Sequence, residues 1–226
     1  MKPGMVLLLI LVSIVMIVWV FTTLETPADI FNPDSTELSG VEIRDYEGEN
    51  LNSVFDFREN SIRGPQRVDI DTYRLSLTGM TDKEQVLSYQ EVLSSFPSYS
   101  KVVTLHCVEG WDVTILWEGK LVSDIIRTAG VKPEANTIIF HAVDGYSTSF
   151  PLKYIQDNPI LLAYRMNNQT LPRDRGYPFQ LIAEDKWGYK WIKWVSKIEL
   201  TDDPAYQGYW ESRGFNNDAD INRSFF

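Results

Sequence analysis

The chain has 226 residues, with 21 lysines and arginines against 31 aspartates and glutamates, so its formal net charge is −10 at pH 7. This excess of acids argues against nonspecific binding to nucleic acid, because neutralising phosphates requires an excess of basic side chains. With 44% hydrophobic residues, the chain has enough apolar surface for a folded core, and its length fits one or two domains.

The N-terminus is directed to a membrane. Met5–Phe21 is an apolar run whose only polar member is Ser13, close to the minimum length that crosses a bilayer. No small-x-small cleavage motif follows it, so we predict that residues 1–24 are a retained membrane anchor or an uncleaved signal. Lys2 precedes the run and the next basic residue is Arg44, which predicts a single-pass protein with the body of the chain outside the cytoplasm.

The rest of the chain divides into two parts. Residues 25–59 carry ten acids and two bases and are predicted to be an acidic tether that wraps onto the domain. Residues 60–226 are predicted to be the folded domain, an α+β, β-rich fold in which short apolar stretches alternate with turn signals. The predicted strands are Asp71–Thr78, Val102–Cys107, Asp112–Trp117, Thr137–His141, Ser147–Phe150, Ile160–Met166, Phe179–Ala183 and Tyr189–Leu200.

Two helices have recognisable boundaries. Ser88 with Glu91 three residues later forms a capping-box pattern, which predicts a helix that continues through Ser95. Leu121–Ala129 places its aliphatic side chains on one face and ends at Gly130, which predicts a second helix.

The last predicted strand, Tyr189–Leu200, contains an irregularity. Its aromatic side chains occupy odd positions up to Trp191, whereas its apolar side chains occupy even positions from Ile192 onward. A strand cannot change faces without a bulge or a turn, and bulges concentrate beside active sites. The neighbourhood of Trp191–Lys193 is therefore predicted to lie at a functional site.

The only cysteine, Cys107, ends a predicted strand. Its thiolate is a soft ligand that a metal ion can hold deprotonated, although the alternative is an inert buried residue. Glu109 is a candidate acid or base if Cys107 is functional. His106 and His141 are too few for a zinc or copper site, and each taken alone is expected to be structural.

A second signal is electrostatic. From Arg165 to Lys197 the chain has seven bases and three acids, which favours an anion site over the alternative of a solvated basic face. Lysines alternating with tryptophans also fit an aromatic-lined sugar groove. The compact anion that best fits a bulged, aromatic-lined strand is a phosphate-bearing cofactor.

Three passages resemble the catalytic domain of the sulfite oxidase family of molybdopterin-dependent oxidoreductases. Residues 107–111 with 117–119 resemble its molybdenum-cysteine segment, residues 171–181 with 186–193 its pterin-phosphate segment, and residues 57–63 its N-terminal pterin-contacting stretch. The resemblance runs from about Tyr46 to Phe215. It is closer to the small periplasmic catalytic subunit of methionine sulfoxide reductase systems than to sulfite oxidase itself.

The resemblance implies a molybdenum-molybdopterin cofactor with Cys107 as the protein ligand to the metal. It implies catalytic roles for Cys107, Glu109 and Trp210. The cofactor-binding residues it implies are Asn60, Ser61, Arg63, Cys107, His141, Arg175, Gln180, Lys190, Trp191, Ile192 and Lys193, with Lys193, Lys190 and Arg175 on the phosphate. Two positions depart from the family, which often has arginine at 180 and a neutral residue or histidine at 175, so rearranged phosphate contacts are expected.

The implied activity is transfer of an oxygen atom to or from a small substrate, with S- or N-oxide reduction favoured. The chain has no Cys-x-x-Cys-His haem motif, so a separate redox partner is expected to exchange electrons with it. The competing hypothesis is a membrane-tethered, non-enzymatic carbohydrate-binding module in which Cys107 is inert.

Overall fold

The computed structural model describes residues 40–226. The predicted membrane anchor and the first part of the predicted tether lie outside the described residues. Within residues 40–226, no helix has the length and apolar character that crossing a membrane requires.

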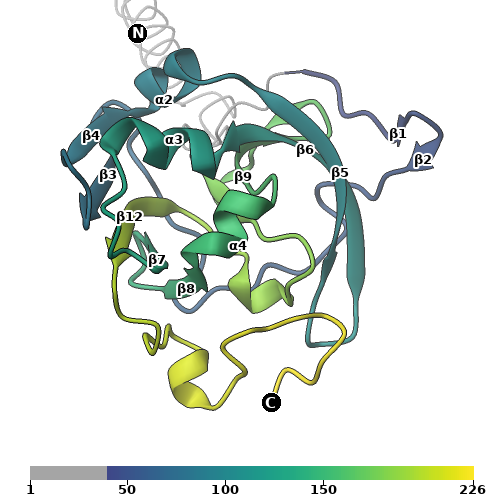
Figure 1. Cartoon of the computed structure of the whole chain (residues 1–226). Helices are drawn as coiled ribbons and strands as arrows, with labels where there is room; N and C mark the ends of the chain where they lie inside the picture. The colour runs from purple at the N-terminus through teal and green to yellow at the C-terminus, as the bar shows by residue number, and fades with distance from the viewer. Residues whose placement is uncertain (1–39) are drawn as a thin grey trace, which may run out of the picture. The chain divides into compact units, whose positions relative to one another are not determined.

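Five antiparallel strands form the first sheet, which contains the long β5–β6 hairpin (Figure 1). Its order is β10-β9-β6-β5, and β11 pairs with β9. The strands are β5 (Tyr99–His106), β6 (Asp112–Leu121), β9 (Leu161–Met166), β10 (Gln169–Thr170) and β11 (Gln180–Ile182). The four strands predicted for this sheet are confirmed. Strand β6 continues four residues beyond its predicted end at Trp117.

The second sheet has the order β4-β3-β12-β7-β8, and within it only the β3–β12 pair is parallel. Its strands are β3 (Arg74–Gly79), β4 (Gln85–Ser88), β7 (Thr137–Ala142), β8 (Ser147–Pro151) and β12 (Val195–Thr201). A separate small hairpin joins β1 (Asp45–Tyr46) and β2 (Glu49–Asn50).

Both predicted helices are present. At the start of α2 (Tyr89–Ser95), Ser88 accepts from the Glu91 backbone and the Glu91 carboxylate accepts from the Ser88 backbone, so the capping box is complete. Helix α3 (Val122–Ala129) ends at Gly130, whose φ of 70° suits glycine. The structure adds α4 (Leu152–Asp157), which packs against β7 and β8, while α3 contacts β6 and α4 (Figure 1).

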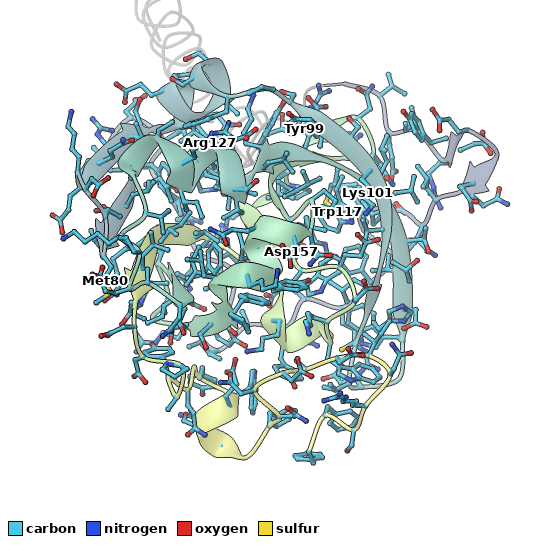
Figure 2. The ribbon with its side chains drawn as sticks, viewed as in Figure 1. Met80, Tyr99, Lys101, Trp117, Arg127 and Asp157 are labelled. Carbon is cyan, nitrogen blue, oxygen red and sulfur yellow. The ribbon has the colours of Figure 1, made fainter. Side chains whose placement is uncertain are left out.

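One apolar core receives side chains from both sheets and from the helices. Trp117 of β6 is fully buried in it and meets Trp191 edge-on, with ring centroids 5.9 Å apart. Lys101 of β5 is the register partner of Trp117, and the two lie side by side in Figure 2. Unlike Trp117, the Lys101 side chain is partly exposed and pairs with Glu184.

The predicted strand Tyr189–Leu200 is wrong in its first half. A 3-10 turn, η3 (Gly188–Lys190), occupies that region, and β12 begins only at Val195, with a register shift between Val195 and Lys197. Trp194 has a φ of 53°, which is rare for a bulky residue and redirects the backbone just before the strand. The change of apolar face in the sequence therefore marks a turn followed by a shorter, irregular strand.

The end of the predicted tether packs into the domain. Val54 is fully buried, and Leu51 and Ser53 are also buried. The backbone N–H of Asn52 donates to the Thr114 carbonyl of β6, at 2.9 Å. The packed part of the chain thus begins before Asn60, where the sequence placed the start of the domain.

A buried lysine on β6, Lys120, hydrogen-bonds to carbonyls at the C-terminal end of α2. The Lys120 ammonium, on a side chain only 2% exposed, donates to the carbonyls of Leu93 and Phe96 at 2.7 Å each. We expect Lys120→Met to lower the free energy of unfolding by about 2 to 4 kcal/mol, because it leaves buried carbonyls unpaired. Urea denaturation measures this. The exposed Lys83→Met is the control, and equal stability of the two variants would contradict the capping role.

Candidate active site

Residues from the three passages singled out in the sequence line one cavity of about 510 Å³. They are the stretch 57–62, the loop that carries Cys107 and Glu109, and the segment 188–194. Of the predicted site residues, those that line it are Asn60, Ser61, Cys107, Glu109, Arg175, Gln180, Trp191, Ile192, Lys193 and Trp210. Segments far apart in the sequence therefore meet at one site.

The loop between β5 and β6 presents Cys107 to this cavity. Its backbone is closed by hydrogen bonds from the Cys107 N–H to the Trp111 carbonyl, at 2.9 Å, and from the Gly110 N–H to the Cys107 carbonyl, at 3.0 Å. Gly110 has a φ of 84°, which lets the loop turn this tightly. Burial raises the pKa of the Cys107 thiol, so a cation at the sulfur is the means to hold it as a thiolate near neutral pH.

Asn60 contacts the sulfur, and Glu109 lies on the same loop as Cys107. The Asn60 amide approaches the Cys107 Sγ at 3.8 Å. The Glu109 carboxylate accepts from the Trp111 indole at 3.2 Å and lies 3.8 Å from the exposed Arg58 guanidinium. The Trp111 indole and the Asn60 amide hold the pKa of Glu109 below its usual value, so this carboxylate is ionised beside the cavity.

The opposite wall comes from residues 188–194. Gly188 packs so closely against the β5 end that an added Cβ would lie 3.2 Å from the His106 carbonyl oxygen, so a side chain there would push this wall away. The Trp194 indole donates to the Arg173 carbonyl at 2.8 Å, and its own carbonyl accepts from the Val143 N–H. These bonds hold the irregular backbone against the cavity.

Two cations line the cavity on this side, and both have protein partners. Lys193 donates to the Glu59 carboxylate and to the Asp174 carbonyl. Arg175 is 4% exposed, and its guanidinium donates to backbone carbonyls of the stretch 54–58. Burial lowers the pKa of Lys193, and the Glu59 carboxylate opposes that shift.

Three predicted residues do not line this cavity. Lys190 is completely buried and bonds to Glu211 at 2.6 Å. His141 bonds through Nε2 to Glu199 at 2.8 Å on the second sheet. Arg63 lies near Gly145, with Nη2 3.9 Å from the position of an added Cβ. The structure therefore gives Lys190 and His141 partners elsewhere in the protein.

The structure adds lining residues that the sequence did not indicate. Asp144 is a buried carboxylate in the β7–β8 turn, where it accepts from the Tyr146 N–H at 2.9 Å. An aspartate before a glycine is an ordinary turn signal, so nothing in the sequence distinguished it. Tyr146 and Phe215 add aromatic surface to the lining.

One buried polar group among the lining residues has no protein partner within residues 40–226. The Ser61 hydroxyl is buried and makes no hydrogen bond within the described residues. The buried Gln180 side chain lines the same cavity. Because buried polar atoms are normally paired, the Ser61 hydroxyl and the Cys107 sulfur fit a polar, metal-bearing ligand.

The comparisons with known proteins decide the family. The family described as oxidoreductase molybdopterin binding domain matches residues 62–210, which is more than half of the chain. The chain belongs to the molybdopterin-dependent oxidoreductases of the sulfite oxidase family. It is therefore an enzyme whose cofactor is molybdenum-molybdopterin, and the carbohydrate-binding alternative is not retained.

Relatives within this sulfite oxidase family differ in length. An uncharacterized oxidoreductase of Bacillus subtilis is 32% identical over 69% of this chain and 78% of its own. Human mitochondrial sulfite oxidase is 30% identical over 73% of this chain and 35% of its own. A putative protein-methionine-sulfoxide reductase subunit of Azospira oryzae is 30% identical over 67% of this chain and 57% of its own.

A solved structure supports the fold of this sulfite oxidase family member. The sulfane dehydrogenase SoxCD from Paracoccus pantotrophus matches with a TM-score of 0.61 and 23% identity, over 69% of this chain and 43% of that chain. The predicted β-rich molybdopterin-binding domain with few helices is thus confirmed.

Proposed function

We propose that this enzyme transfers an oxygen atom to or from a small substrate, with S- or N-oxide reduction favoured, and that the Cys107 thiolate is the protein ligand to molybdenum. One observation carries the proposal: the only cysteine of the chain lies in the same cavity as the stretch 57–62 and the segment 191–193. The similarity to a putative protein-methionine-sulfoxide reductase subunit supports the reductive direction.

The roles of the chain's own residues follow from their positions. The bound cofactor supplies the oxygen-atom transfer. Ser61, Gln180 and Asp144 offer it polar partners, and Lys193 is the cation placed for its phosphate. Glu109 and the aromatic ring of Trp210, at the side of the cavity that faces solvent, are placed to orient the substrate.

The charges in the cavity support a neutral substrate. The charged lining residues are three cations and three carboxylates, namely Arg58, Arg175, Lys193, Glu59, Glu109 and Asp144. Each cation has a carboxylate or a carbonyl as partner, and the lining carries no net positive charge that would favour an anionic substrate such as sulfite. A sulfoxide or an amine oxide is neutral overall and meets no such disadvantage.

We also propose that the protein is anchored in a membrane through residues 1–24, with the catalytic domain outside the cytoplasm, and that it exchanges electrons with a separate redox partner. The apolar run Met5–Phe21 and the position of Lys2 support the anchor and its orientation. The absence of a haem-attachment motif in the sequence supports the separate partner.

A metal and substrate assay tests the proposal. We expect the full chain, purified from a host that makes molybdopterin, to contain about one molybdenum per molecule. A dye-linked assay should show turnover with methionine sulfoxide, dimethyl sulfoxide or trimethylamine oxide, and much less with sulfite. A well-folded preparation that lacks molybdenum, or one that turns over sulfite alone, would contradict it.

A further inference from the structure

The stretch 57–66 borders the cavity without belonging to a sheet or a helix. Within the described residues it makes no backbone-to-backbone hydrogen bond. Its side chains nevertheless make specific contacts. Glu59 pairs with Lys193, and the Asn60 amide lies 3.8 Å from the Cys107 sulfur. Something other than secondary structure must fix the start of this stretch.

One side chain provides that fixation. The Arg175 guanidinium donates to three backbone carbonyls. Its Nε donates to that of Val54 at 2.9 Å, its Nη1 to that of Arg58 at 3.1 Å and its Nη2 to that of Phe57 at 2.6 Å. Its Cζ also lies 3.8 Å from the centre of the Phe57 ring, a close cation–π contact. A planar fork of donors can hold three carbonyls at once, which a lysine ammonium at the same position cannot reproduce.

The position of Arg175 is itself well defined. It ends the turn η2 (Arg173–Arg175), and its backbone N–H donates to the Pro172 carbonyl at 2.9 Å. The Asp174 carboxylate lies 3.7 Å from Nη2 and, with the three carbonyls, offsets the burial of the charge. The guanidinium donors are thus directed at the backbone of residues 54–58.

We propose that Arg175 is a positioning residue: it clamps residues 54–58 and so places Asn60 beside the Cys107 sulfur. The clamp takes the place of the strand pairing that this stretch lacks. It also gives the arginine at this position a role that does not depend on the pterin phosphate. The consequence for the metal rests on the proposed function, whereas the clamp itself does not.

Limited proteolysis of the full chain tests the clamp. The Arg58 side chain is 78% exposed, so trypsin can cut after it once residues 54–62 detach. We expect Arg175→Lys to be cut after Arg58 at least about tenfold faster than the wild type, because cleavage follows the population of the open form. Phe57→Leu, which removes only the ring, should accelerate cleavage less. Arg127→Lys, at an exposed arginine of α3 that pairs with Asp124, is the control and should behave as wild type.

A second readout separates positioning from general destabilisation. In molybdenum-loaded protein, the Mo(V) electron paramagnetic resonance signal of Arg175→Lys should shift in the same direction as that of Asn60→Ala. The proposal would be overturned if Arg175→Lys were cut at the wild-type rate, or if it were cut faster at every trypsin site and not mainly after Arg58. It would also be overturned if the Mo(V) signal of Arg175→Lys were unchanged while that of Asn60→Ala shifted. If the wild-type chain did not load molybdenum, the proposed function would be refuted. The cleavage rates would still show whether Arg175 holds residues 54–58.

Discussion

Replacing Cys107 by serine is expected to lower turnover by more than about 100-fold. This is a larger loss of activity than usually follows when a residue that only hydrogen-bonds to a metal ligand is replaced. A serine hydroxyl has nearly the same shape, but it is a hard and much less acidic donor than a thiol. The buried cavity around it is otherwise unchanged, so we expect the variant to fold and to retain the pterin. Dye-linked turnover and molybdenum content, measured on the same preparation, check this.

Thr104→Ser is the matched control for this variant. Thr104 lies on β5, the strand that precedes Cys107, outside the cavity lining, and its hydroxyl pairs with that of Thr114 at 2.8 Å. It should keep wild-type turnover. A Cys107→Ser enzyme with normal turnover would show that the sulfur is not needed at the metal.

The largest effect on stability is expected at the buried ion pair of Lys190 and Glu211. Both side chains are inaccessible to solvent and their charged atoms lie 2.6 Å apart. Lys190 also donates to the Ser149 carbonyl at 2.9 Å, and Thr148 donates to the Glu211 carboxylate at 2.6 Å. We expect Lys190→Met to cost about 3 to 5 kcal/mol in urea denaturation, because it leaves a buried carboxylate without its cation.

The double variant Lys190→Met/Glu211→Met should be less destabilised than Lys190→Met alone, because no unpaired charge stays in the interior. Lys153→Met is the control, since its ion pair with Asp157 is exposed and should contribute little. If Lys190→Met proved as mild as Lys153→Met, the buried pair would not be holding η3 to η4 (Glu211–Arg213).

Local chemistry made much of the fold predictable. The capping box at Ser88 and the glycine at Gly130 correctly marked a helix start and a helix end. Short apolar stretches between turn signals also located the two strands of the hairpin β5–β6, although β5 ends at His106, one residue before Cys107. These signals are carried by neighbouring residues, which is why a single sequence contains them.

The pairing of distant charges was not predictable in this way. The basic segment 165–197 suggested an anion site, but Lys193 pairs with Glu59 and Lys190 with Glu211. Neither partner is close to its lysine in the sequence, and only the tertiary fold brings them together. For the same reason the sequence did not indicate that the Arg175 donors reach the carbonyls of a stretch more than a hundred residues earlier.

The central claim is that the Cys107 sulfur binds molybdenum, and X-ray absorption at the molybdenum edge tests it most directly. The spectrum of the wild-type enzyme should contain one sulfur neighbour of the metal more than that of Cys107→Ser loaded with the same cofactor. Identical sulfur shells in the two proteins would contradict the claim.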